Sequence, residues 1–194
     1  MSTVKATNFQ HPSAASPAIV LDADGGVTGD NGLKQIAFGN FSSVSVQTID
    51  TVFTASPSVY LLVINSQGTV AGTSYLTFNM RAAGVTLNSA GSYQLSGVIN
   101  SPTAGPTRDY QVTTFGVLGN IGTNAGQVVA WIVVPASSNF PTVMSQMFGS
   151  GSTDSYIGNY HTRATVAGTY DGIRFAPTSG TMSGTYRLYK LQGD

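Results

Sequence analysis

Hydrophobic and polar residues alternate with a period of two in short runs along most of this chain. Ile173 and Phe175, for example, flank Arg174, which places apolar and polar side chains on opposite faces of an extended strand. Segments rich in Gly, Ser, Asn and Pro separate these runs at roughly the 8–12-residue spacing that two packed antiparallel sheets require. The pattern therefore predicts an all-β protein, and no segment shows helical periodicity over more than one turn.

The predicted strands are short and cover most of the chain after residue 32. They span residues 33–38, 43–54, 58–65, 73–81, 84–88, 92–99, 109–118, 127–134, 142–148, 155–165, 170–176 and 184–191. The last two should form a β-hairpin, because the segment 177–184 contains the Pro, Ser and Gly residues that favour tight turns. In this hairpin Tyr186 and Leu188 should share one face, and Arg187 should lie on the other.

Two predicted strands are apolar on both faces, where a strand with one solvated face would alternate. They span residues 59–64 and 128–134. One face can fill the core of a sandwich, and the other must be covered. Another subunit, a long loop or the N-terminal segment could provide this cover, and all three interpretations stay open. Trp131 is expected in the core or in a subunit interface.

The composition supports an all-β fold and excludes several partners. Only 8% of the residues are charged, eight basic against eight acidic, and they form no basic stripe, so we expect no nucleic-acid or membrane partner. The chain contains no Glu and few Lys, which leaves little material for exposed helices. It contains no Cys, which excludes disulfides and thiolate metal sites. The N-terminus lacks the hydrophobic core of a signal peptide, so we expect synthesis in a cytoplasm without export by that route.

Residues 1–32 differ in pattern from the rest of the chain. Short extended runs at 4–9 and 18–21 are interrupted by His-Pro-Ser and Ser-Pro, and a polar Gly-Asp-Asn-Gly linker follows at 29–32. Strands this short are not stable in water by themselves. We therefore predict an extended N-terminal arm, residues 1–32, that docks on the main domain or on neighbouring copies. A single β-sandwich domain of jelly-roll type should follow over residues 33–194.

Two segments resemble parts of phage virion proteins. The segment VKATNFQHPSAASPAIVLDADGGVT resembles the N-termini of fibre and fibre-like proteins of marine and cyanobacterial phages. The segment YDGIRFAPTSGTMSGTYRLYKL resembles the closing hairpin of small β-sandwich domains in tailed-phage tail fibres, and the positions that fit are Ile173, Phe175, Ser179, Gly180, Ser183, Gly184, Leu188 and Tyr189. The resemblance implies a homotrimer in the virion, with the arm as its attachment or intertwining segment.

The chain offers no recognisable catalytic or metal-binding constellation. Its eight carboxylate side chains are all Asp, and most stand in turn sequences such as Tyr-Asp-Gly at Asp171, so turn formation explains them better than glycoside hydrolysis. Asp22, Asp24 and Asp30 could supply oxygen ligands to Ca²⁺, but the EF-hand spacing and its terminal Glu are missing. No Ser stands in a nucleophile elbow. We therefore predict no enzymatic activity, no metal and no cofactor.

A candidate glycan-binding surface lies around the loop 152–160. Asp154, Tyr156, Asn159 and Tyr160 combine aromatic rings, on which sugars stack, with groups that hydrogen-bond to hydroxyls. The loop carries no charge cluster, which suits a neutral polysaccharide. The alternative is that both tyrosines are ordinary strand residues with a solvated hydroxyl. The loop 101–109 is a second candidate surface.

These features together predict a structural protein of a phage virion, made in the host cytoplasm. It should be of the short tail fibre or fibre-tip type and adsorb to host-surface polysaccharide, with other virion proteins bound through the arm. Because the chain lacks a long shaft, a capsid decoration or head fibre protein is an alternative. A non-viral carbohydrate-binding β-sandwich module is the alternative from a different class.

Overall fold

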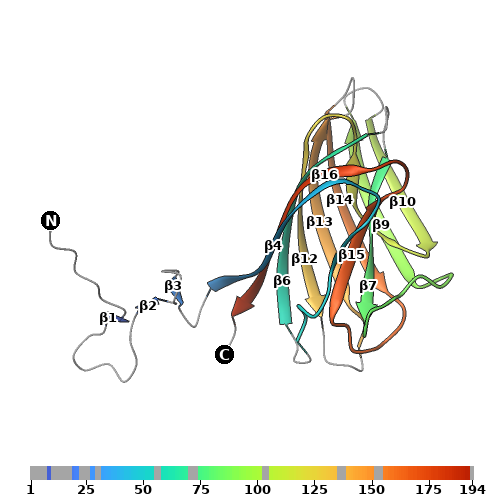
Figure 1. Ribbon diagram of the computed structural model, residues 1–194. Helices are drawn as coiled ribbons and strands as arrows, with labels where there is room; N and C mark the ends of the chain where they lie inside the picture. The colour runs from blue at the N-terminus through green and yellow to red at the C-terminus, as the bar shows by residue number, and fades with distance from the viewer. Residues whose placement is uncertain are drawn as a thin grey trace, which may run out of the picture.

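The structure of the protein, a computed structural model, is built from antiparallel β-strands (Figure 1). It describes residues 8–9, 19–21, 27–28, 32–54, 58–69, 74–101, 105–134, 139–150 and 155–192. Within these ranges there is no helix, and hence none that is long and apolar enough to span a membrane. The prediction of an all-β sandwich of antiparallel strands is confirmed.

Three short strands lie in the N-terminal region. They are β1 (Asn8–Phe9), β2 (Ile19–Leu21) and β3 (Val27–Thr28), and they pair antiparallel in that order. This small sheet shares no hydrogen-bonded ladder with the rest of the described chain. Most other residues of the predicted arm lie outside the described residues, so its extended form stays a prediction.

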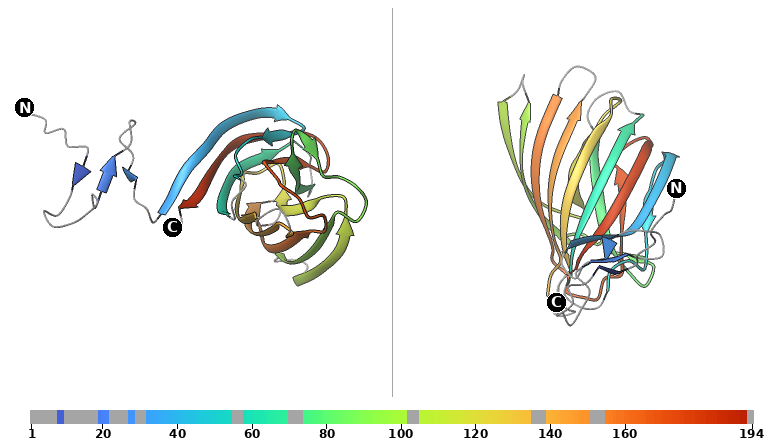
Figure 2. Two further views of the ribbon diagram at one scale, coloured as in Figure 1. Left: turned by 90° about the horizontal axis from the view of Figure 1, so that it is seen from below. Right: turned by 90° about the vertical axis from the view of Figure 1, so that its left-hand side faces the viewer.

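Two further sheets form the sandwich. The strands of the larger sheet are β4 (Gly32–Val44), β6 (Ser58–Gly68), β9 (Tyr93–Ser101), β10 (Gly105–Thr113), β12 (Gly126–Val134), β13 (Thr142–Ser150), β14 (Ser155–Ala164) and β16 (Met182–Gln192). The strands of the smaller sheet are β5 (Gln47–Ile49), β7 (Ser74–Ala82), β8 (Val85–Thr86), β11 (Gly116–Ile121) and β15 (Gly172–Pro177). The larger sheet has the order β10-β9-β14-β13-β12-β6-β16-β4 and curls around the smaller one, of order β11-β7-β15-β5 with β8 attached to β7 (Figure 2).

The sandwich strands pair in a nested way. When the short β8 and the antiparallel pairs β9–β10 and β13–β14 are set aside, the first remaining strand pairs with the last, β4 with β16. The next pairs inward are β5 with β15, β6 with β12, and β7 with β11. The two strand pairs that were set aside extend the larger sheet beyond β12. The larger sheet therefore consists of a nested half and an added half.

The predicted C-terminal hairpin is wrong, because its two strands belong to different sheets. β15 pairs with β5 and β7, whereas β16 pairs with β4 and β6. The turn between them is held by hydrogen bonds to other segments, including Thr178 N–H to the Tyr75 carbonyl at 2.9 Å. It therefore carries the chain across the sandwich. The predicted faces are confirmed where burial defines them, since the side chains of Ile173, Phe175 and Leu188 are fully buried.

Two other predicted strands are divided where the chain changes sheet. The predicted strand 43–54 is wrong in extent, because β4 ends at Val44 and only Gln47–Ile49 continues as β5 in the smaller sheet. The predicted strand 109–118 joins the end of β10 to the start of β11, which are separated by a bend at Thr114 and Phe115. Both breaks lie in sequence with continuous strand propensity, so the local pattern carried no signal for them.

The hydrophobic core lies between the two sheets, and aromatic rings occupy much of it. Phe78 and Tyr93 pack edge to face with ring centroids 5.7 Å apart, and Phe41 packs on Phe175 in the same manner. An inward-facing glycine makes room for a ring of the neighbouring strand. Gly97 lies directly opposite Tyr160, and a Cβ atom at Gly97 would lie 2.6 Å from that ring. A larger residue at Gly97 would therefore displace the Tyr160 ring.

Tyr93 places a hydrogen-bonding group inside this core. Its ring is fully buried, and its hydroxyl accepts a hydrogen bond from the Met80 N–H at 2.8 Å and donates one to the Leu87 carbonyl at 3.1 Å. Burial raises the pKa of the Tyr93 hydroxyl well above its ordinary value, and burial also raises the pKa of Tyr170. The folded protein therefore retains protons that the unfolded chain releases in alkaline solution.

We predict that the free energy of unfolding falls as pH rises above about 10, the ordinary pKa of tyrosine. The folded-state pKa is raised, so the stabilisation is complete below that pH and is lost above it, by up to about 1.4 kcal/mol per pH unit for each tyrosine. Tyr93→Phe should flatten this dependence. It should also cost about 1–3 kcal/mol at neutral pH, because the Met80 N–H loses its partner. Urea titrations at a series of pH values measure both effects, and equal slopes for the two proteins would contradict the assignment.

Candidate functional site

The outer face of the larger sheet carries an unusual concentration of exposed apolar side chains. Of the thirteen exposed large hydrophobic side chains in the described part of the chain, eight lie on this face: Leu33, Phe38, Val98, Trp131, Met144, Phe148, Ile157 and Leu191. No described strand packs on this face. The right-hand view of Figure 2 shows the strands of the larger sheet side by side. Exposed apolar surface on this scale marks a binding or association surface.

A hollow of about 760 Å³ lies in this outer face, over strands β9, β12, β13 and β14. Its lining consists of Ser96, Gly97, Val98, Val129, Trp131, Met144, Ser145, Gln146, Asn159, Tyr160 and His161. The exposed members alternate along each strand with side chains that point into the core. We refer to this feature as the outer hollow.

The strand register brings the outward lining side chains together in two adjacent rows across the sheet, which continue onto β6 at Leu61 and Val63 beyond the lining. One row consists of Leu61, Trp131, Met144, His161 and Ser96, and the other of Val63, Val129, Gln146, Asn159 and Val98. Neighbouring members of a row stand on paired strands, about 4.8 Å apart. Residues that are far apart in the sequence therefore form one contiguous surface.

The outer hollow has an apolar side and a polar side. Trp131 and Met144 are 38% and 47% exposed and form the apolar side with Val129. Gln146, Asn159 and His161 form the polar side, and their side chains are exposed. Among the described residues, none of these three side chains has a hydrogen-bond partner. The lining contains no Asp, Lys or Arg, so the arrangement suits a neutral, amphipathic ligand.

Trp131 lies on a correctly predicted strand but on the opposite face from the core. The predicted strand 127–134 corresponds to β12, whose inward side chains are Val128, Ala130, Ile132 and Val134. The indole of Trp131 points outward and is 38% exposed, so it does not lie in the core. The sequence could not reveal this, because β12 is apolar on both faces and alternation did not identify the buried one. Its place in a subunit interface, the other expected position, stays a prediction.

We predict losses of stability of very different size for two neighbouring residues of β12. Ile132→Ala should lower the free energy of unfolding by about 2–5 kcal/mol, because it leaves a cavity at a fully buried position. Trp131→Ala should lower it by about 1 kcal/mol or less, as is usual for surface positions. Urea unfolding of the two variants measures the difference. A comparable loss in both would show that the indole is covered in solution.

The structure places Asn159 and Tyr160 of the predicted glycan surface on opposite faces of β14. Asp154 lies outside the described residues, and Tyr156 is placed only by its position in β14. Asn159 points outward and lines the outer hollow. Tyr160 is 3% exposed, and its hydroxyl donates to Asn120 Oδ1 of the smaller sheet at 3.0 Å. Tyr160 is thus corrected from a stacking residue to a core residue, because even-numbered positions of this part of β14 face inward.

Sequence reasoning missed Trp131, Gln146 and His161 as partners of Asn159 in one site. These residues belong to three different strands, and only the pairing of β12 with β13 and of β13 with β14 brings them together. A single sequence shows alternation within a strand but not which strands are neighbours. The two-sided apolar pattern of residues 128–134 was the one available signal that the outer face carries apolar side chains.

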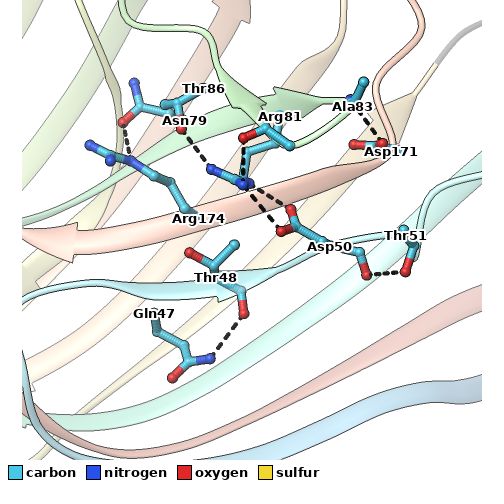
Figure 3. Close-up of polar contacts among 11 residues, drawn as sticks. Gln47, Thr48, Asp50, Thr51, Asn79, Arg81, Ala83, Thr86, Asp171 and Arg174 are labelled. Carbon is cyan, nitrogen blue, oxygen red and sulfur yellow. Dashed lines mark hydrogen bonds and ion pairs between the residues drawn. The ribbon is translucent and has the colours of Figure 1, made fainter.

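A second polar cluster lies on the smaller sheet (Figure 3). Arg81 on β7 donates from Nε and Nη2 to the two carboxylate oxygens of Asp50, at 2.5 and 3.1 Å. Its Nη1 donates to Thr86 Oγ1 at 2.8 Å, and its Nη2 also donates to the Gly84 carbonyl at 2.7 Å. The hydrogen bond to Asp50 raises the pKa of the Arg81 guanidinium. The cluster ties the end of β5 to the β7–β8 turn.

Asp171 supports the same turn, and the cluster is best explained as structural. One oxygen of Asp171 accepts a hydrogen bond from the Ala83 N–H at 2.9 Å, and Ala83 has a φ of 49° that few non-glycine residues adopt. The Arg81 and Asp171 contacts thus fix a turn with a strained backbone. Over the described ranges, no group of three or more His or Asp side chains is placed to hold a metal ion.

Comparison with known proteins does not identify a relative. The chain matches no protein-family model, no curated protein and no solved structure. The function must therefore be inferred from the geometry of the outer hollow and from the residues of the chain itself.

Proposed function

We propose that this chain is a structural protein of a phage virion, of the short tail fibre or fibre-tip type, that contributes to adsorption on host-surface glycans. The resemblance of its terminal segments to phage fibre proteins supports the viral context. The observation that carries the binding role is the outer hollow, where the exposed ring of Trp131 lies beside amide and imidazole groups that have no hydrogen-bond partner among the described residues. The proposed role is non-enzymatic and needs no metal or cofactor.

We propose further that the sandwich is a jelly roll. Its nested pairs, from β4–β16 through to β7–β11, support this assignment. A jelly roll arises when one long antiparallel pairing of the first half of a chain with the second half wraps into two sheets of four strands. The added half of the larger sheet, β9, β10, β13 and β14, would then be an elaboration of this core. The N-terminal arm would link the domain to other virion proteins.

Self-association into a homotrimer is proposed through the end of the larger sheet formed by β4 and β16. Leu33 and Leu191 lie directly opposite each other and are 44% and 41% exposed. Phe38, on the same strand as Leu33, is 50% exposed. Figures 1 and 2 show that the paired ends of β4 and β16 extend beyond the other strands as a two-stranded ribbon. Closed rotational symmetry would cover these side chains.

We predict that the purified protein sediments as a trimer at micromolar concentration. Replacing both leucines, Leu33→Asp with Leu191→Asp, should give a folded monomer, because each copy would then place two charges in the interface. Val166→Asp is the matched control, since Val166 is also 44% exposed but lies elsewhere. Sedimentation velocity and circular dichroism measure assembly and folding. A monomeric wild-type protein would contradict the proposal.

The adsorption role predicts where the protein is found and what it does there. Gold-labelled antibodies against the purified chain should bind intact particles of the phage that encodes it, at the tail. The purified protein should also bind host cells and compete with particles for adsorption. Labelling of the capsid without competition would instead favour a decoration or head fibre protein. Polysaccharide binding without labelling of any particle would favour a carbohydrate-binding module.

A further inference from the structure

We infer that the outer hollow binds a neutral pyranose unit, with Trp131 as the stacking platform and Gln146, Asn159 and His161 as hydrogen-bonding partners of its hydroxyl groups. The inference rests on the adsorption function proposed above and names the ligand class and the residues of that site. It transfers the binding surface from the loop 152–160 to the face of the sheet. Asn159 is the one residue that the two surfaces share.

The apolar side of the hollow fits the carbon-bonded face of a sugar ring. Trp131 pairs directly with Met144 across strands β12 and β13. Val129 lies two residues before Trp131 on β12 and therefore points to the same face. All three side chains are apolar, and the indole offers the largest flat surface among them. A pyranose ring has one face of C–H groups that can lie on such a surface without losing a hydrogen bond.

The polar side of the hollow fits the hydroxyl groups of the same ring. Gln146 and Asn159 are direct cross-strand neighbours, and His161 is the cross-strand neighbour of Met144. These three side chains supply amide and imidazole groups that can both donate and accept. Sugar hydroxyls do the same, so one ring can satisfy several of them at once. The side chains have no partner among the described residues, so ligand contacts would replace only water.

Size and charge narrow the ligand class. The volume of about 760 Å³ falls within the 300–1,000 Å³ range usual for small-molecule sites. It exceeds a single sugar ring and leaves room for the neighbouring units of a chain. No carboxylate and no Lys or Arg side chain lines the hollow, so it offers no carboxylate to a cationic sugar and no Lys or Arg to an acidic one. These properties favour a neutral polysaccharide.

Core contacts of β14 fix the backbone that carries most of the polar side of the outer hollow. The inward side chain between Asn159 and His161 is Tyr160, whose hydroxyl bonds Asn120 of the smaller sheet at 3.0 Å. Gly97 lies opposite Tyr160 on β9 and has no Cβ atom, which leaves room for the Tyr160 ring. The backbone that carries Asn159 and His161 is thus fixed by core contacts. A preorganised site loses less conformational entropy on binding.

A second copy of the chain fits the hollow less well than a sugar. An interface between copies would have to bury Gln146, Asn159 and His161, and each buried polar group without a partner costs about 1–3 kcal/mol. The apolar pair Leu33 and Leu191 offers a surface for self-association without that cost. We therefore assign the hollow to the ligand and the ribbon of β4 and β16 to assembly.

The single tryptophan of the chain makes the test direct, because any change of its emission reports on this site. The full-length protein is titrated with neutral hexasaccharides of glucose, mannose, galactose and N-acetylglucosamine, and with an acidic galacturonic acid hexamer. At least one neutral hexasaccharide should shift the emission of Trp131 to shorter wavelength and saturate. Calorimetry should confirm its binding, whereas the acidic hexamer should bind more weakly.

Variants locate the binding in the hollow. Trp131→Ala should weaken the binding measured by calorimetry about tenfold or more, because a stacking contact is lost. Gln146→Ala and Asn159→Ala should each weaken it several-fold. Phe140→Ala is the matched control, since Phe140 is also 38% exposed and aromatic but does not line the hollow, and it should bind as the wild type does. Far-ultraviolet circular dichroism confirms that each variant is folded.

Several results would overturn the inference. They are the absence of any emission change with the neutral hexasaccharides, equal affinity of Trp131→Ala and wild type, or tighter binding of the acidic hexamer. An emission that changes with protein concentration alone would show that another copy covers the hollow. Particle labelling without sugar binding would remove this inference and leave the virion role. Sugar binding at Trp131 without particle labelling would keep this inference and remove the virion role.

Discussion

The register of five neighbouring strands, β6, β12, β13, β14 and β9, determines both the core and the candidate site. Side chains alternate between the two faces of each strand, so one register places Ile132 in the core and Trp131 outside it. A shift of one residue in the register of β12 would turn its inward side chains outward and its outward side chains inward. The smaller sheet holds this register from the inside, where Tyr160 bonds Asn120 and where β11 packs against β13 and β14.

The nested pairing and the added strands have different roles in this arrangement. The nested pairs, β4–β16 through β7–β11, close the sandwich and bury its core. The outer hollow lies mainly on the added strands β9, β13 and β14, together with their neighbour β12. The frame is thus built by pairs distant in sequence. The candidate surface is built mainly by strands of two local pairs placed against the edge of the frame, and β12 of the frame contributes Trp131. Such a division lets a binding surface vary without loss of the frame.

Most strands could be predicted from the sequence, because alternation and turn residues are local signals. The extents of β6, β9, β12, β13 and β14 agree with the prediction to within a few residues. The pairing could not be predicted, and the separation of β15 from β16 shows why: a turn rich in Ser and Gly suits a hairpin and a crossing between sheets equally well. The candidate site could not be predicted for the same reason, because Trp131, Gln146 and His161 are brought together only by the pairing of their strands. The direction of the Tyr160 side chain was predicted wrongly, because the loop residues beside it did not indicate which face of the strand it occupies.

One face of the larger sheet is buried, and the other is open to solvent. Methionine oxidation tests this arrangement on one strand, because Met144 is 47% exposed on the outer face and Met147 is 1% exposed on the inner face. The native protein is treated with dilute hydrogen peroxide, and sulfoxide at each methionine is followed by mass spectrometry. We predict rapid oxidation of Met144, with Met147, Met80 and Met182 protected as long as the protein is folded. Protection of Met144 equal to that of Met147, or oxidation of Met147 at the rate of Met144, would contradict this arrangement.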